Sequence, residues 1–285
     1  MELWLILSIT GYAIGAIAGI IDKYMMNLQF HPVTTVLFRT LFNAIFLSLA
    51  GILFFNLNIN LSTLFLAGIP AFILAISFVI YLFVLQRKNA SEIQPFSQSL
   101  DVLFIFLASV IILNEQTRFA NYIGILLIFI GVYLVVTENI TKIPKLDYNL
   151  LIIIALVPID VLYALLLKIY LTNTEPITLA VSIYIMAFFM LTIIALFLRR
   201  KLVLKMSFLK IQIPNVIMAS LCAAAAIVLL YTALSQTYAS KVYPMSGISS
   251  ITAFLLATMF LKEKFYWHRF IGTLIVFIGI YLISI

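Results

Sequence analysis

Long apolar stretches, separated by short clusters of charged residues, proline or asparagine, dominate this sequence. Each is long enough to cross a membrane, because about 20 mostly apolar residues span about 30 Å of hydrocarbon. The stretches are continuous rather than alternating, which is typical of membrane-spanning helices and not of the strands of a barrel. The ten predicted spans are residues 3–21, 33–55, 62–85, 93–113, 119–137, 149–167, 176–198, 211–234, 242–261 and 267–285.

Composition excludes most soluble classes of protein. Apolar residues make up 65% of the 285 residues and charged residues 9%, whereas soluble domains contain about 45–50% and about 25%. We therefore expect an all-α integral membrane protein, and we disfavour a soluble enzyme, a nucleic-acid-binding protein and a disordered chain. The single cysteine, Cys222, cannot form an intrachain disulfide, and two histidines offer little for a metal site. No metal and no cofactor are expected.

The distribution of lysine and arginine predicts an orientation, because basic connections concentrate on the cytoplasmic side. We expect the first apolar run to be a retained span, since no basic segment precedes it as in a signal peptide. Connections that follow odd-numbered spans then contain thirteen basic residues, against three on the opposite side. The thirteen are Lys23, Arg87, Lys88, Lys142, Lys145, Arg199, Arg200, Lys201, Lys205, Lys210, Lys262, Lys264 and Arg269; the three are Arg118, Lys168 and Lys241. This bias predicts a cytoplasmic-membrane protein with both termini outside and the 199–210 connection in the cytoplasm.

The second half of the chain repeats the first. Residues 123–135 and 271–283 are identical at eight of thirteen positions, including two glycines and a tyrosine. Residues 90–97 and 239–246 share alanine, serine and proline in the same order, and Lys23 and Pro32 match Lys168 and Pro176. Residues 1–141 and 142–285 are thus predicted to be two five-helix repeats. An odd number of spans inverts the second repeat relative to the first, an architecture that recurs in secondary transporters.

Each half also carries short landmarks near its end. Leu-x-Glu occurs at 113–115 and 261–263, each followed nine residues later by glycine, and a Gly-x-Tyr-Leu run closes each half. With Pro32 followed by Arg39, these residues resemble the EamA-type ten-helix members of the drug/metabolite transporter superfamily. The resemblance covers essentially the whole chain. It implies transport of small metabolites, such as amino acids, driven by a gradient or by exchange rather than by ATP.

Polar residues inside the predicted fourth span form one face. Gln94, Ser97, Gln98 and Asp101 stand at i, i+3, i+4 and i+7, a spacing that places them on one side of a helix. Their counterparts in the second half, Tyr243, Ser246, Gly247 and Ser250, are again small or polar. Two such faces predict a polar cavity between the halves. Hydrogen bonding between neighbouring helices is the alternative interpretation.

Other charged residues lie inside spans, where each requires a reason because a buried charge is costly. Asp160 is central in the sixth span, and Arg39 with Asn43 stands at i, i+4 in the second. Arg39 is expected to hold an anionic group of the cargo, to pair with Asp101 or Asp160, or to extend to the membrane surface. An aspartate without a cationic partner is a candidate proton carrier.

Gly11, Gly15 and Gly19 form a stripe of small residues along the first span. Such a stripe favours close helix packing, and it also opens room opposite Asp160. The two interpretations are compatible.

The pattern as a whole favours a secondary active transporter, with export as the preferred direction and alternating access coupled to protons or to exchange. A lipid-linked substrate flippase or a subunit of a multidrug exporter is the alternative. A membrane-embedded enzyme is disfavoured, since no metal-binding, nucleophile-elbow or phosphate-loop motif occurs. The expected partners are a small-molecule substrate, the lipid bilayer and protons, with no nucleic acid. The chain acts as a monomer or a homodimer.

Overall fold

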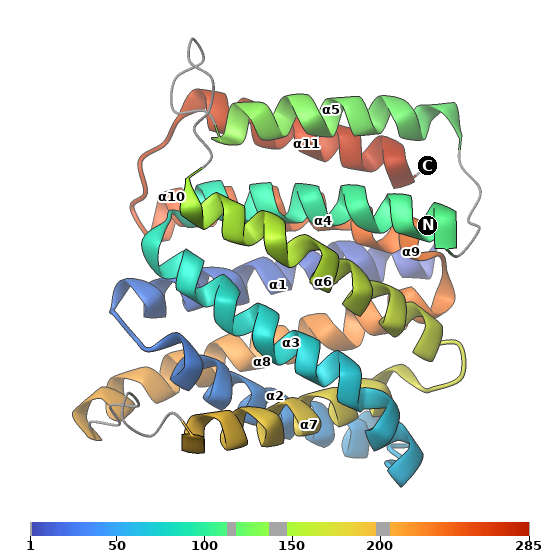
Figure 1. Cartoon of the computed structure of the whole chain (residues 1–285), viewed down its shortest axis with the longest axis vertical. Helices are drawn as coiled ribbons and strands as arrows, with labels where there is room; N and C mark the ends of the chain where they lie inside the picture. Colours follow the sequence, from blue (N-terminus) through green and yellow to red (C-terminus); the bar gives the residue numbers. More distant parts are fainter. Residues whose placement is uncertain (1, 113–117, 137–146, 198–205, 285) are drawn as a thin grey trace.

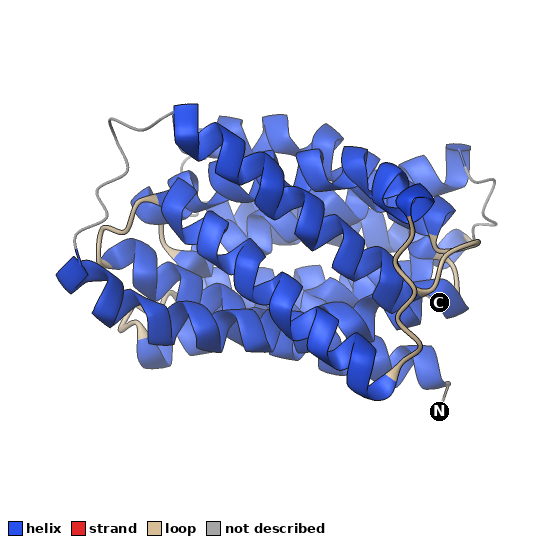
Figure 2. Cartoon of the chain, turned by 90° about the horizontal axis from the view of Figure 1, so that it is seen from below, coloured by secondary structure: helices blue, strands red, loops and turns tan. Residues whose placement is uncertain are grey.

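The computed structural model describes residues 2–112, 118–136, 147–197 and 206–284, which form a bundle of helices without a strand (Figure 2). Eight spans in this part are long and apolar enough to cross a membrane, and two shorter apolar helices accompany them. The all-α, ten-span prediction is confirmed. The elements are α1 (Leu3–Asn27), α2 (Pro32–Phe54), α3 (Leu61–Arg87), α4 (Ala90–Ile112), α5 (Phe119–Val136), α6 (Tyr148–Tyr170), α7 (Pro176–Phe197), α8 (Met206–Gln236), α9 (Ala239–Val242), the 3-10 turn η1 (Tyr243–Ser246), α10 (Gly247–Phe260) and α11 (Trp267–Ser284).

The helix boundaries follow local signals. Pro32 and Pro176 are the first residues of α2 and α7, a position where the missing amide proton costs nothing. The side chains of Asn60 and Asp147 accept hydrogen bonds from backbone amides in the first turns of α3 and α6. Two predicted bounds are wrong: α1 continues to Asn27 rather than residue 21, and α8 begins at Met206 rather than 211.

A buried lysine near the end of α1 and a half-buried lysine near the end of α6 reveal the repeat. Lys23 was predicted to lie in a connection, but it is buried within α1 and donates to Leu85 O at 2.8 Å and Lys88 O at 2.6 Å. In the second repeat Lys168 donates to carbonyl oxygens at the end of α8, Leu234 O at 2.9 Å and Thr237 O at 2.7 Å. Each lysine satisfies the carbonyl groups that a helix end leaves without an intrahelical partner.

Contacts between helices show the same inverted symmetry. α1 packs along α8 as α6 packs along α3, and α1 contacts α10 as α6 contacts α4. α1 begins and α11 ends at the same end of the bundle (Figure 1). The predicted boundary between the repeats, 141/142, lies outside the described residues, as do Lys142, Lys145, Glu115 and the start of the 199–210 connection.

The two repeats differ where the fourth span of one matches the ninth span of the other. Pro95 lies inside the continuous helix α4, whereas its counterpart Pro244 lies in η1, between α9 and α10. Three short elements therefore form the ninth span, Ala239–Phe260.

Packing of α1 on α8 is closer than that of α6 on α3. A Cβ on Gly11 would lie 2.9 Å from Leu230 Cγ, and one on Gly15 would lie 3.7 Å from Ala226 Cβ. The sixth span has larger side chains at the equivalent positions, Leu156 and Asp160, which hold α3 further away. Both interpretations of the glycine stripe therefore apply, since Gly15 also lines the central cavity described below.

α5 and α11 lie side by side at one edge of the bundle (Figure 1). Their glycines pair crosswise: a Cβ on Gly272 would lie 2.8 Å from Gly131 O, and a Cβ on Gly279 would lie 2.7 Å from Gly124 O. Crosswise pairing of equivalent residues is what a two-fold relation between repeats requires. The approach of the two backbones leaves no space for a side chain.

Gly272→Ala is expected to destabilise the bundle by about 1–3 kcal/mol, because the new methyl group meets backbone atoms that cannot move aside cheaply. The midpoint of thermal unfolding of the detergent-purified protein measures the effect. Gly68→Ala is the matched control, since a Cβ there meets no atom within 4 Å. Equal midpoints for the two variants would contradict close packing of α5 on α11.

Candidate functional site

A cavity of about 440 Å³ lies at the centre of the bundle. Its lining comes from α1, α2, α3, α4, α6, α7 and α8, while α5 and α11 lie outside it. Apolar groups form much of the wall, including Leu74, Phe78 and Leu230. Polar and charged side chains also line it from six of these helices, including Asp22, Arg39 and Asn43, and such groups can fix the orientation of a bound small molecule.

The polar face predicted for the fourth span lies in this cavity. Gln94, Ser97, Gln98 and Asp101 all line it. Ser97 donates to Asp101 Oδ2 at 3.4 Å, and Gln94 lies against the open position of Gly19 on α1. The helical spacing read from the sequence thus leads to one shared surface.

The matching face of the second repeat does not line the cavity. Ser250 is fully buried and donates to Gln98 Oε1 at 2.5 Å, while Gln98 Nε2 donates to Ser249 Oγ at 3.1 Å. The Tyr243 hydroxyl points to Ala164 O at 3.5 Å, and Ser246 is buried. Because the ninth span is interrupted at η1, Ser250 and Tyr243 contact neighbouring helices rather than face the cavity, which is the alternative interpretation. The buried Ser246 hydroxyl has no hydrogen-bond partner among the described residues.

Asp101 and Asp160 bring two carboxyl groups to the same space. They come from α4 and α6, both are half-buried, and both line the cavity. Two carboxyl groups that border one space are suited to holding a cation or a proton.

Arg39 is neutralised by a residue that the sequence did not single out. Its Nε lies 3.0 Å from Asp22 Oδ1, its Nη2 lies 3.2 Å from Asp22 Oδ2, and its Nη1 donates to Ser220 Oγ at 3.2 Å. Both ions are 3% exposed. Asp22 is thus the partner of Arg39, in place of the expected Asp101 or Asp160, and Arg39 does not extend to the membrane surface.

Asp22 was not predicted to lie inside a span, because the first span was predicted to end at residue 21. The available signal was charge balance: Arg39, inside a span, requires a buried acid, and Asp22 is close in sequence on the preceding helix. The second repeat has Leu167 and Ile183 at the positions equivalent to Asp22 and Arg39. The ion pair therefore belongs to one repeat only.

Several buried oxygens in the cavity wall have no hydrogen-bond partner among the described residues. They include Asn43 Oδ1, Ser77 Oγ, Gln94 Oε1 and Asp101 Oδ1. An unsatisfied buried polar atom costs about 1–3 kcal/mol. These acceptors, all lining one cavity, indicate that a polar, hydrogen-bonding molecule belongs there.

Tyr163 and Tyr231 lie at a different level of the bundle from the ion pair. The hydroxyl groups of Tyr163 and Tyr231 are 2.6 Å apart, and Tyr163 lines the cavity. Ser220 and Tyr231 are both on α8, about 16 Å apart along its axis at the usual rise per residue. The polar space therefore lies between an ionic contact and an aromatic one.

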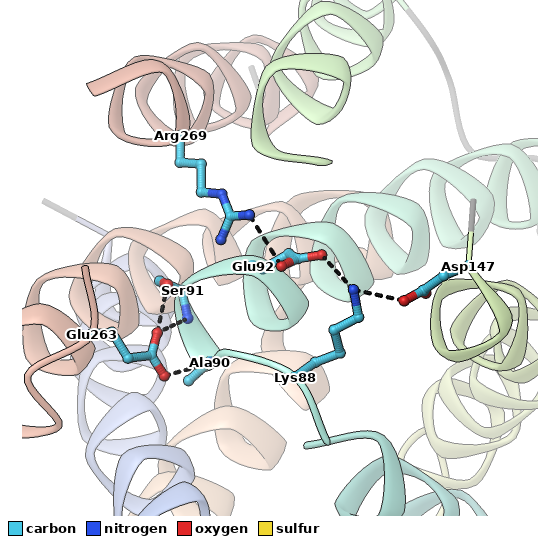
Figure 3. Close-up of polar contacts among 7 residues, drawn as sticks. All are labelled: Lys88, Ala90, Ser91, Glu92, Asp147, Glu263 and Arg269. Carbon is cyan, nitrogen blue, oxygen red and sulfur yellow. Dashed lines mark hydrogen bonds and ion pairs between the residues drawn. The ribbon is translucent and has the colours of Figure 1, made fainter. Parts of the chain in front are cut away.

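A second group of charges ties the repeats together at one end of the bundle (Figure 3). Lys88 Nζ lies 2.7 Å from Asp147 Oδ2 and 3.4 Å from Glu92 Oε1, and Glu92 Oε2 lies 3.2 Å from Arg269 Nη2. Glu263 accepts hydrogen bonds from the amides of Ala90 at 2.8 Å and Ser91 at 3.0 Å, at the start of α4.

These contacts also set the charge states of two half-buried groups, Asp147 and Lys88. Burial alone would raise the pKa of Asp147, but hydrogen bonds from Lys88 and from the Leu150 amide outweigh it and lower the pKa. Burial alone would lower the pKa of Lys88, but Asp147 and Glu92 outweigh it and raise the pKa. Both groups are charged at neutral pH.

Comparison with known proteins agrees with this architecture. A model of the EamA-like transporter family matches residues 2–137 and 148–285, one match for each half. The chain is also similar to a protein of known crystal structure, with a TM-score of 0.62 and 14% identity over 97% of this chain and 94% of the other. That likeness shows the fold alone. No curated protein sequence matches the chain.

Asp22→Asn is expected to destabilise the protein by about 3–5 kcal/mol, because it leaves the Arg39 charge buried without its partner. The double variant Asp22→Leu/Arg39→Ile, which copies the second repeat, is expected to recover most of that loss. Thermal unfolding of both variants measures the difference. A double variant as unstable as the single one would show that the charges do more than neutralise each other.

Proposed function

Because the chain belongs to the EamA-like transporter family, we propose that it is a secondary active transporter that exports a small metabolite, such as an amino acid, across the cytoplasmic membrane. Members of this family are transporters and not enzymes. The substrate occupies the central cavity, which two inverted repeats expose alternately to either side of the membrane. Movement is driven by protons or by exchange.

The charge of the cavity supports this class of substrate. The Arg39 charge is balanced by Asp22, whereas Asp101 and Asp160 face the cavity without an ion pair among the described residues. A substrate with an ammonium group complements the two carboxylates. Asn43, Gln94 and Gln98 provide amide groups for its other polar atoms.

Proton coupling runs through the same two carboxylates in this proposal. A proton and a substrate ammonium group compete for Asp101 and Asp160, so that binding of one releases the other. Competition for a shared site is sufficient to exchange the two across a membrane, without any further coupling device.

Each of the single variants Asp101→Asn and Asp160→Asn is expected to abolish uptake driven by a pH gradient in liposomes. Because each variant retains one carboxylate for the ammonium group, substrate exchange is expected to continue, with weaker substrate binding. The substrate for this assay comes from thermal unfolding against a panel of amino acids, since a ligand at 100 times its dissociation constant adds about 2.7 kcal/mol. Glu175→Gln, at an exposed position outside the cavity, is the matched acid-to-amide control. Unchanged pH dependence in both aspartate variants would exclude coupling through these residues.

The outcome of the panel also distinguishes the proposed function from the alternative one. Amino acid binding that depends on Asp101 supports the proposal. A stable protein that binds no amino acid, but moves a lipid-linked or hydrophobic compound, would favour a flippase or a multidrug exporter.

The proposed orientation places both termini outside and the basic connections in the cytoplasm. In a Cys222→Ala background, Asn58→Cys between α2 and α3 is expected to react with a membrane-impermeant maleimide in intact cells. Asn27→Cys at the end of α1 is expected to react only after permeabilisation. Both positions are exposed. The reverse pattern would show the opposite orientation.

A further inference from the structure

A second cavity lies at the end of the bundle where α3 meets α4 and α11 begins. Its volume is about 450 Å³. The lining is polar and joins the two repeats; it consists of Arg87, Lys88, Asn89, Glu92, Tyr266, His268 and Arg269. Basic side chains outnumber the single acid, Glu92. The central cavity has the opposite charge, so the two spaces suit different molecules.

Arg269 has guanidinium donors in this second cavity that are not used in hydrogen bonds to described residues. It is 6% exposed, and only its Nη2 contacts Glu92. In Figure 3 a single dashed line joins its guanidinium group to the residues drawn. Nε and Nη1 are buried and have no hydrogen-bond partner within the described part of the chain. Leaving such donors unsatisfied is costly for an ionised group.

His268, next to Arg269 in the sequence, also has a nitrogen without a hydrogen-bond partner in the part of the chain that the structure describes. Its Nε2 is buried without a hydrogen-bond partner among the described residues, and the residue lines the same cavity. Arg87, which is exposed, adds a third basic group from the first repeat. Lys88 is already held by Asp147 and Glu92. The groups available to a ligand are therefore Arg269, His268 and Arg87.

The position of the cavity along the bundle is that of a membrane surface. Trp267, next to His268, is 69% exposed, and exposed tryptophans at helix ends mark the level of lipid headgroups. A ligand here is accessible both from the headgroup region and from the aqueous solution.

We propose that this cavity binds a phosphate group, held by Arg269 and His268 of the second repeat and by Arg87 of the first. Several oxygens around one anionic centre can accept from all three side chains at once, whereas a carboxylate offers two. Arginine is suited to such a contact because its planar donors match phosphate oxygens. The phosphate belongs to an anionic phospholipid or to a soluble phosphorylated compound.

Thermal unfolding of the purified full-length protein in an uncharged detergent tests this site with two probes. Inorganic phosphate is titrated at constant ionic strength, and phosphatidylglycerol is compared with phosphatidylcholine in mixed micelles. We expect the unfolding midpoint to rise with phosphate, with phosphatidylglycerol or with both. A response to phosphatidylglycerol alone identifies a lipid site, and a response to phosphate alone identifies a soluble ligand.

Variants assign the effect to the cavity. Arg87→Gln changes an exposed residue, so the protein is expected to remain folded, and it should weaken binding about tenfold, as loss of one charged hydrogen bond does. Arg269→Gln retains a donor for Glu92 and should abolish the response. Arg118→Gln, an exposed arginine outside the cavity, should leave it unchanged. Absence of a response to both probes, or equal responses in Arg87→Gln and Arg118→Gln, would overturn the proposal.

Discussion

Hydrocarbon offers no hydrogen bonds, so most polar groups of the described residues either find a protein partner or border a polar space. For the backbone this requirement produces helices. For side chains it separates two populations. Lys23 and Lys168 reach carbonyl oxygens at helix ends, whereas Asn43 and Asp101 keep unpaired oxygens in the cavity wall. Polar residues of the first kind hold the bundle together, and those of the second kind define where a substrate can lie.

The inverted repeat distinguishes the same two populations in another way. Contacts found in both repeats, such as those of Lys23 and Lys168 and the crosswise glycines of α5 and α11, position helices. Charges found in one repeat surround the central cavity: Asp22 and Arg39 have apolar counterparts, and Asp101 corresponds to Ser250. Symmetry therefore sets the architecture, and departures from symmetry give the cavity its charge. The asymmetry extends to packing, since glycines draw α1 onto α8 while Asp160 and its neighbours separate α6 from α3.

Much of the fold could be predicted from the sequence, because membrane spans depend on length and hydropathy, which are local properties. The polar face of α4 could be predicted equally well, since the spacing of its residues is that of a regular helix. The equivalent face of the ninth span was harder to predict. Its side chains depend on where η1 interrupts the helix, and Pro95 and Pro244 give different results in similar sequences. The role of Asp22 could not be predicted from its own span, because it depends on pairing with Arg39 on the next helix.

Charge explains why one bundle needs two polar spaces. Arg39 lines the central cavity, yet Asp22 cancels its charge, so the excess there comes from Asp101 and Asp160 and is negative. At the end of the bundle Glu92 and Asp147 are shared among Lys88 and Arg269, and the remaining excess is positive. A cation or proton is drawn to the first space and an anion to the second. An anion at the end would bridge Arg87 of one repeat to Arg269 of the other, and would strengthen the contact between the halves that the proposed alternating access rearranges.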